Sequence, residues 1–164
     1  MLRTIITLIG FALRLISIEP KRIYYKHLIN IGRGSEAAFG VERTVKSLVD
    51  FVERIAGISY EVEGMENIPE DVALFVGNHQ SYIDIAAVVT QMGSLKSILA
   101  KKEVLSIPFL KGWMELFECI TIDRGDTRES LKSLGKVQEL LEEGKSVVIF
   151  PEGTRTRGSD MLPF

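Results

Sequence analysis

The sequence contains only one cysteine, Cys119, and two histidines, His27 and His79, among its 164 residues. A single cysteine excludes an internal disulfide framework and is compatible with a reducing compartment. No C-x2-C or H-x3-H spacing is present, so the sequence gives no indication of a metal site. The length suffices for one domain with a substantial hydrophobic core.

The sequence also lacks a strong overall charge, since its formal net charge is −2. The basic residues are unevenly distributed: residues 1–33 hold six of them against one acidic residue, a local charge of +5. No basic stripe interleaved with aromatic residues follows in the net acidic remainder. Nucleic acid is therefore not an expected partner.

Long hydrophobic runs are scarce as well. The segment Leu2–Ile18 predicts a helix about 25 Å long, a little short of a hydrocarbon core of about 30 Å. Its charged start and apolar stretch are similar to a secretory signal, but no small-x-small cleavage pattern follows. The segment predicts a membrane-associated helix, and both a spanning and an interfacial position stay open.

The next segment, residues 36–58, has apolar residues at three- and four-residue steps and charged residues between them. This pattern is typical of an amphipathic helix. Such a helix either packs on the core of the domain or docks on a membrane together with the first helix. We assign residues 1–57 to N-terminal membrane-associating helices and residues 58–164 to a second unit.

The second unit changes the period of its pattern. Residues 58–64 alternate in polarity and predict a strand with one solvent-exposed face. Four short apolar runs follow, at residues 72–76, 97–100, 119–122 and 147–150, with helical patterns between them, the clearest at residues 129–143 before Gly144. Buried runs that alternate with helices predict an α/β fold, a mainly parallel sheet covered by helices.

Polar residues follow each apolar run, at the edge of such a sheet where ligands bind. They include His79 after the first run, Lys101 after the second, Arg124 after the third, and the stretch from Pro151 to Arg155 after the fourth. Each alone is weak evidence, because loops are polar anyway. Together they predict a site that combines an imidazole with several cations.

His79 and Asp84 are candidates for a catalytic pair. On one continuous helix they would point roughly 140° apart. If His79 lies in the turn and a helix begins near Ser81, Asp84 can orient the imidazole as a general base for an alcohol. Alternatively, Ser81 and Asp84 form a capping box, and the two roles are compatible. Ser81 lacks the G-x-S-x-G surroundings of a nucleophile.

The stretch FPEGTRTRG, residues 150–158, combines backbone amides around Gly153 with the guanidinium of Arg155. Backbone amides and an arginine fork are suited to bind phosphate. The alternative is a solvated basic loop, with Lys101, Lys102 and Arg124 as ordinary surface charge. Their shared place at the strand ends favours an anionic substrate.

These motifs resemble those of the glycerolipid acyltransferase family. NHQSYID is similar to the family's N-H-x-x-x-x-D motif, and FPEGTRTRG is similar to its F-P-E-G-T-R-S motif. Between them, AKKEVLSIPFLKGW and CITIDRGD resemble two further family segments in the same order. The resemblance covers residues 72–164 and is nearest to the 1-acyl-sn-glycerol-3-phosphate acyltransferases.

The resemblance implies transfer of a fatty acyl group from acyl-CoA or acyl-carrier protein to the 2-hydroxyl of lysophosphatidate, which gives phosphatidate. It implies His79 as the base and Asp84 as its partner, and no cofactor or metal. The implied substrate-binding residues are Lys101, Arg124, Glu152, Gly153, Thr154 and Arg155. It also implies association with the lipid bilayer, at the cytoplasmic face of the cell membrane. The alternatives are another lysophospholipid or glycerol 3-phosphate as acceptor, or a non-catalytic membrane-binding fragment.

The sequence departs from the family pattern at three positions and at its end. Glu118 and Thr121 stand where glycine and an aromatic residue are common, and Val104 replaces a common leucine. Family members continue beyond the L-P-F motif into a further helix and strand, whereas this chain stops at Phe164. We therefore expect a chain truncated at its C-terminus.

Overall fold

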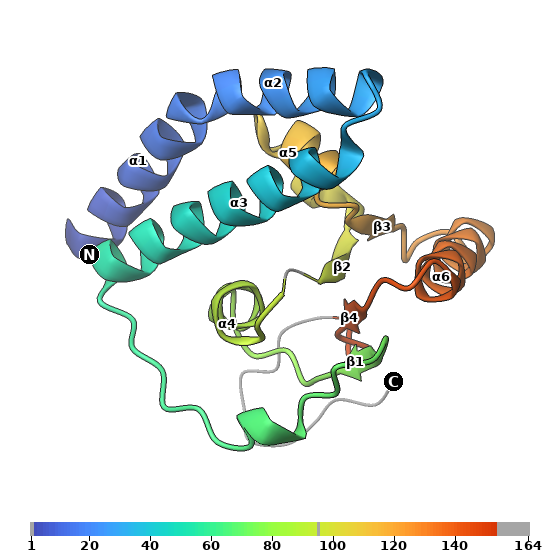
Figure 1. The fold of residues 1–164 in the computed structure, drawn as a ribbon. Coiled ribbons are helices and arrows are strands. Elements are labelled where there is room, and N and C mark those ends of the chain that lie inside the picture. Colours follow the sequence, from blue (N-terminus) through green and yellow to red (C-terminus); the bar gives the residue numbers. More distant parts are fainter. Residues whose placement is uncertain (1, 95, 154–164) are drawn as a thin grey trace.

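A computed structural model gives the structure of the protein and describes residues 2–94 and 96–153 (Figure 1). The described helices are α1 Leu2–Ser17, α2 Glu19–Asn30, α3 Gly34–Ala56, α4 Ile83–Gln91, α5 Leu110–Leu116 and α6 Thr127–Glu142, with two short 3-10 helices, η1 Met65–Asn67 and η2 Lys102–Ser106. The described strands are β1 Leu74–Val76, β2 Ser97–Lys101, β3 Ile120–Ile122 and β4 Val147–Ile149.

The four strands form one sheet in the order β1-β4-β2-β3, and each pairing is parallel. All four apolar runs are strands, so the predicted α/β fold with its parallel sheet is confirmed. The last strand, β4, lies between β1 and β2, with Val147 opposite both Leu74 and Ser97. The segments that follow β1 and β4 are therefore neighbours, although about 70 residues separate them in the sequence.

Helices cover both faces of the sheet. Successive residues of a strand point to opposite faces, so neighbouring residues of β4 pack against different helices. In β4, Val148 packs with Val45 and Val88, which belong to α3 and α4. Its neighbour Val147 packs with Val137 of α6 on the other face. Helix α6 begins where the Asp126 side chain accepts hydrogen bonds from two backbone amides of the first turn.

Helix α3 buries its apolar stripe inside the protein, with Ala37, Val41 and Leu48 at most 7% exposed. It lies between the α1–α2 pair and α4 (Figure 1). This burial agrees with the core-helix interpretation of residues 36–58. Helix α2 also contacts the sheet domain, since Trp113 Nε1 of α5 donates a hydrogen bond of 3.0 Å to Glu19.

Most exposed apolar side chains of the N-terminal region belong to α1 and α2. They include Leu2, Ile5, Leu8, Ile9, Leu13, Ile16 and Ile23, each more than half exposed. None of the described helices combines the length and the apolar character needed to cross a membrane.

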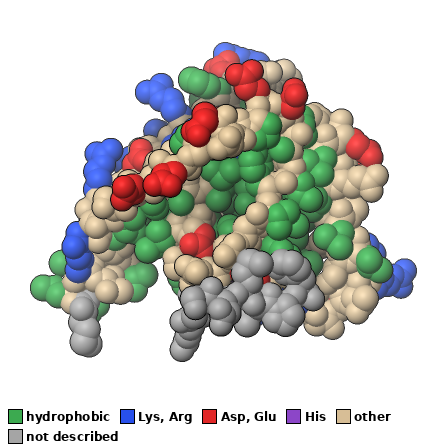
Figure 2. Space-filling model, turned by 90° about the horizontal axis from the view of Figure 1, so that it is seen from below, with side chains coloured by type: hydrophobic (Ala, Val, Ile, Leu, Met, Phe, Trp, Pro, Cys, Tyr) green, Lys and Arg blue, Asp and Glu red, His purple; other side chains and the backbone are tan. Residues whose placement is uncertain are grey.

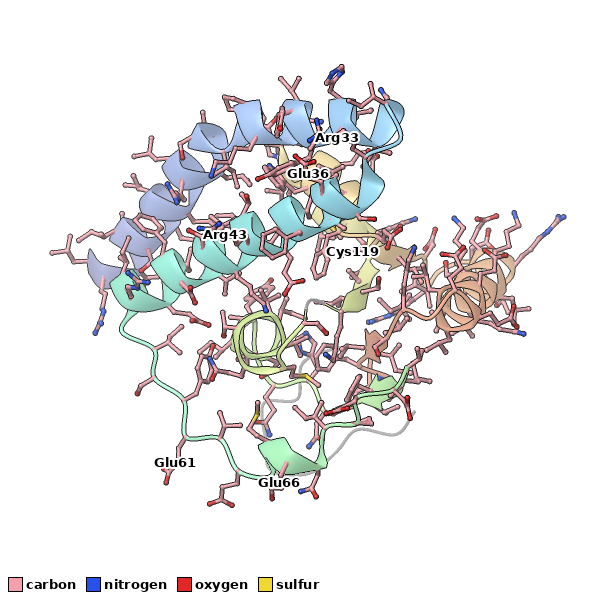
Figure 3. The ribbon with its side chains drawn as sticks, viewed as in Figure 1. Arg33, Glu36, Arg43, Glu61, Glu66 and Cys119 are labelled. Carbon is pink, nitrogen blue, oxygen red and sulfur yellow. The ribbon has the colours of Figure 1, made fainter. Side chains whose placement is uncertain are left out.

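The predicted strand at residues 58–64 is wrong. This segment is extended but pairs with no strand of the described chain, and Glu61 points away from the molecule (Figure 3). It is held by a side chain instead, because the Tyr60 hydroxyl donates a hydrogen bond of 2.7 Å to the buried carboxylate of Glu53. Burial and the Glu53 carboxylate raise the pKa of Tyr60. Alternating polarity indicates that one face of a segment is buried. Here the partly buried side chain of Tyr60 packs inward on Glu53, so the segment has a buried side without a neighbouring strand.

Strand β1 is an edge strand whose outer face is open. Leu74 and Val76 are 44% and 60% exposed, whereas Phe75 between them packs on the core. Seen from below, the molecule shows hydrophobic side chains across the middle of its face and acidic side chains along one edge (Figure 2).

Candidate active site

His79 lies in an irregular turn that joins β1 to α4. The turn starts at Gly77, whose backbone N–H extends the parallel ladder with a hydrogen bond of 3.2 Å to the carbonyl of Ile149. Helix α4 begins at Ile83, and the Ser81 hydroxyl accepts a hydrogen bond of 3.0 Å from the backbone N–H of Ile83. This places His79 at the carboxyl edge of the sheet, directly before a helix.

Asp84 receives three hydrogen bonds from this turn on one oxygen. Its Oδ2 atom lies 2.8 Å from His79 Nδ1, 2.7 Å from Gln80 N and 2.9 Å from Ser81 N. Burial opposes the ionisation of Asp84, but the hydrogen bonds from Ser81, Gln80 and His79 outweigh it and lower its pKa. The carboxylate therefore binds the backbone of the turn before α4 and holds the imidazole at once. The capping box is only partly formed, since the N-cap residue of α4, Tyr82, makes no side-chain capping hydrogen bond.

The orientation of His79 has a chemical consequence. Because an ionised carboxylate only accepts hydrogen bonds, Nδ1 carries the proton that points toward Asp84. The other ring nitrogen, Nε2, is then unprotonated in the neutral imidazole and can accept a proton. The pair has the arrangement of a general base with an orienting carboxylate.

Glu152 supports the same turn from the neighbouring strand. Its side chain is 8% exposed, and Oε1 accepts a hydrogen bond of 3.1 Å from the backbone N–H of His79. The sequence assigned Glu152 to substrate binding. In the structure its carboxylate joins the end of β4 to the turn after β1.

Phe150 packs against the imidazole of His79. The two ring centroids are 4.7 Å apart, and the ring planes are inclined by 31°. The imidazole is thus fixed at Nδ1 by Asp84, through its backbone by Glu152, and on one face by an aromatic ring.

Arg124 and Gly153 bring the ends of β3 and β4 together. Strand β2 separates β3 from β4, so Arg124 reaches across the end of β2 to the turn after β4. There its guanidinium lies so close to Gly153 that a Cβ atom added at position 153 would stand 2.9 Å from Nη1. Gly153 has a φ of +71°, a conformation that favours glycine.

The remaining predicted site residues have different outcomes. Lys101 is exposed and forms an ion pair of 3.2 Å with Glu103. Its neighbour Lys102 pairs with Asp123, which precedes Arg124. Thr154 and Arg155 lie outside the described residues. Within residues 2–94 and 96–153, no group of three or more histidine, cysteine, aspartate or glutamate side chains could hold a metal ion.

The family model described as Acyltransferase matches residues 59–164, more than half of the chain. The chain belongs to the acyltransferase family. This match begins within the extended segment before β1 and includes every residue of the candidate site.

Several curated proteins are similar to this chain. The 1-acyl-sn-glycerol-3-phosphate acyltransferase of Pseudomonas aeruginosa is 41% identical over 112 residues, which cover 67% of this chain and 43% of that protein. The protein of the same name from Saccharomyces cerevisiae is 31% identical over 124 residues, or 74% of this chain and 41% of that protein. The chain therefore spans less than half the length of these relatives.

A solved structure has the same fold. The 1-acyl-sn-glycerophosphate acyltransferase PlsC from Thermotoga maritima superposes with a TM-score of 0.67 at 23% sequence identity. The superposition covers 98% of this chain and 66% of that one. It extends over the N-terminal helices of this chain as well as over its sheet.

Phe150 is the residue of the candidate site that sequence reasoning missed. It is the last apolar residue of the fourth run and the first residue of the FPEGTRTRG stretch, but sequence reasoning assigned its side chain no role at the site. The signal that would have found it is the strand order: Val76 pairs with Ile149, so the residues after each lie side by side.

Proposed function

We propose that this acyltransferase moves a fatty acyl group from acyl-CoA or acyl-carrier protein to the 2-hydroxyl of lysophosphatidate and forms phosphatidate. The names of its relatives support this acceptor. The observation that carries the proposal is the hydrogen bond of 2.8 Å between His79 Nδ1 and Asp84 Oδ2 at the carboxyl edge of the sheet.

In the proposed reaction, Nε2 of His79 removes the proton from the acceptor hydroxyl as its oxygen attacks the thioester carbonyl. The new C–O ester bond forms, the C–S bond breaks, and the leaving thiolate takes the proton back from the imidazolium. Asp84 keeps the imidazole in the required tautomer and balances its positive charge. The reaction needs no redox partner, so we propose no cofactor beyond the acyl thioester.

The phosphate of the acceptor binds beside the imidazole in this proposal. Arg124 supplies a guanidinium at the turn after β4, and the backbone around Gly153 approaches it closely. Thr154 and Arg155, which follow directly in the sequence, complete the phosphate site. Lys101 contributes at the end of β2 after leaving its exposed ion pair with Glu103, which costs little because such pairs are weak.

We place the protein at the membrane, on its cytoplasmic face, where lysophosphatidate is dissolved in the bilayer. The exposed apolar residues of α1 and α2, such as Ile5, Leu13 and Ile23, support an interfacial seat for these helices. Basic residues on the same helices favour an anionic lipid surface.

The proposal is tested by acyl transfer in membranes that contain the protein or its His79→Ala variant. We expect the variant to lose about 10²–10⁴-fold in turnover, the typical contribution of a general base. His27→Ala is the matched control, since His27 lies on α2, far along the chain from the site. Wild-type turnover of His79→Ala would refute the assignment.

The acceptor is tested in the same membranes. Lysophosphatidate, glycerol 3-phosphate and lysophosphatidylcholine are compared, and we expect the highest kcat/KM for lysophosphatidate. Arg155→Ala should raise KM far more for lysophosphatidate than for an acceptor whose head group has no net charge. Equal effects on both would remove the phosphate role of Arg155.

A further inference from the structure

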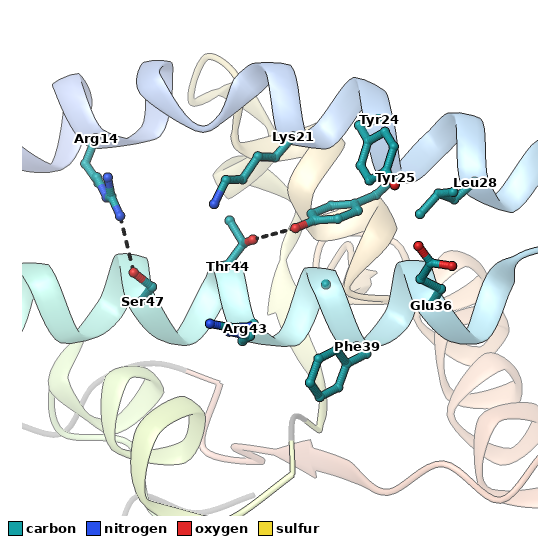
Figure 4. A pocket seen from close by; sticks show the side chains of 11 residues that line it. Arg14, Lys21, Tyr24, Tyr25, Leu28, Glu36, Phe39, Arg43, Thr44 and Ser47 are labelled. Carbon is teal, nitrogen blue, oxygen red and sulfur yellow. Dashed lines mark hydrogen bonds between the residues drawn. The ribbon is translucent and has the colours of Figure 1, made fainter.

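A second concave site lies between the N-terminal helices and shares no residue with the candidate active site (Figure 4). Its volume is about 450 Å³, and all its lining residues belong to α1, α2 and α3. No step of the proposed reaction uses it.

Three cations line this pocket, one from each helix: Arg14 of α1, Lys21 of α2 and Arg43 of α3. Within the part of the chain that the structure describes, none of them forms a salt bridge. The one carboxylate in the lining, Glu36, pairs with Arg33. The pocket therefore carries positive charge without a neutralising partner among the described residues.

Arg14 is held in place by its surroundings. Its Nη2 atom donates a hydrogen bond of 3.2 Å to the Ser47 hydroxyl, and its guanidinium carbon lies 5.8 Å from the centre of the Phe51 ring. Its Nε atom is buried and has no hydrogen-bond partner among the described residues. A buried N–H without a partner costs free energy.

Hydroxyl groups complete the polar lining. The Tyr25 and Thr44 hydroxyls lie 3.0 Å apart and share a hydrogen bond, and Ser47 adds a third hydroxyl one turn further along α3. Guanidinium, ammonium and hydroxyl groups together are the donors that bind a phosphate group.

The rim of the pocket is apolar and exposed. Tyr24 and Phe39, which line it, are 51% and 66% exposed. A phosphate pocket with such a rim fits an amphiphile, whose head group enters the pocket while its chains stay in a bilayer.

We propose that this pocket binds the phosphate of an anionic phospholipid at the membrane surface. The site is separate from the one that binds the reacting acceptor, and it fixes α1, α2 and α3 against the head-group layer. The inference rests on the proposed membrane location of the protein but not on acyl transfer.

The test measures binding of the protein to vesicles by sedimentation, without acyl donor. Vesicles of phosphatidylcholine alone are compared with vesicles that also contain phosphatidylglycerol. The pocket variant is Lys21→Ala with Arg43→Ala. The matched control is Lys26→Ala with Arg54→Ala, which removes one lysine from α2 and one arginine from α3 outside the pocket.

Both variants lose general attraction to the anionic surface. Their affinity for the vesicles should fall about fivefold for each cation removed. On vesicles with phosphatidylglycerol, we expect the affinity of the pocket variant to fall at least about tenfold further than that of the control. The reason is that the pocket variant also loses charge-assisted hydrogen bonds to phosphate. On vesicles of phosphatidylcholine alone, the pocket variant and the control variant should bind equally well. Equal losses on phosphatidylglycerol would overturn the proposal.

A second arm distinguishes the source of the phosphate. Coenzyme A and inorganic phosphate are added as soluble competitors during sedimentation. We expect neither to displace the protein beyond the effect of their ionic strength. Displacement by coenzyme A that the pocket variant no longer shows would assign the pocket to the acyl donor and refute the lipid. Acyl transfer to detergent-dispersed lysophosphatidate should persist in the pocket variant, so failure of this inference differs from failure of the proposed function.

Discussion

The guanidinium of Arg124 lies directly against Gly153, although β2 separates the two strands that these residues follow. A Cβ atom at position 153 would stand 2.9 Å from Nη1 and 3.0 Å from Cζ of Arg124. The absence of a side chain at Gly153 is therefore what lets the arginine reach the turn after β4.

Gly153→Ala should weaken binding of the acceptor because the new methyl group displaces Arg124. We expect KM for lysophosphatidate to rise, and stability to fall by about 1–2 kcal/mol because alanine is strained at positive φ. Gly135→Ala is the control: position 135 is open and helical, so alanine should stabilise it by about 1 kcal/mol. In an Arg124→Ala background, Gly153→Ala should no longer affect KM. An unchanged effect there would contradict the mechanism.

Phe150→Leu should impair His79 through the loss of ring stacking. Aromatic pairs contribute about 0.5–1.5 kcal/mol, so kcat should fall up to about tenfold. KM for the acceptor should stay unchanged, because Phe150 acts through the imidazole. Phe150→Tyr keeps the ring and should restore kcat. If Phe150→Tyr were as impaired as Phe150→Leu, stacking would not be the cause.

Asp84 should make stability depend on pH. Its pKa is lower in the folded protein, so the unfolded chain binds more protons in acid. The stabilisation is complete above the ordinary aspartate pKa and disappears as the pH falls through the lowered value. Asp84→Asn should cost about 1–3 kcal/mol at neutral pH, and less in acid. Thermal unfolding measured across this range, with the exposed Asp71→Asn as control, checks the prediction. A difference that does not change with pH would refute it.

Glu118 occupies a backbone conformation that glycine adopts more easily, since its φ is +54°. Its side chain forms an exposed ion pair with Lys145. Glu118→Gly and Glu118→Ala both remove that ion pair, so their difference reports on the backbone alone. We expect the glycine variant to be more stable by about 1 kcal/mol in chemical denaturation. Equal stabilities would show that this turn imposes no strain.

A glycine at this position, as the family resemblance implies, has a structural reason. Glu118 stands in the turn between α5 and β3, where the chain needs a left-handed residue. The sequence showed the departure, but the backbone angle gives its meaning.

The sequence by itself determined the local elements and their type. The four apolar runs became parallel strands, and the amphipathic segment became α3, because hydrophobic periodicity directly reflects which side of an element is buried. It also determined the link between His79 and Asp84, because only five positions separate them. His79 lies in the turn before α4, and Asp84 lies in the first turn of that helix. The strand expected at residues 58–64 failed because alternation indicates a buried face and does not supply a partner strand.

Only the tertiary structure decided which strand ends meet. The position of β4 between β1 and β2 brings Glu152 and Phe150 to His79, and the reach of Arg124 across β2 brings it to Gly153. The pocket of Arg14, Lys21 and Arg43 depends in the same way on how three helices pack. Such contacts join residues far apart in the chain, and strand order and helix packing are fixed by the complementarity of whole surfaces, which no local pattern contains.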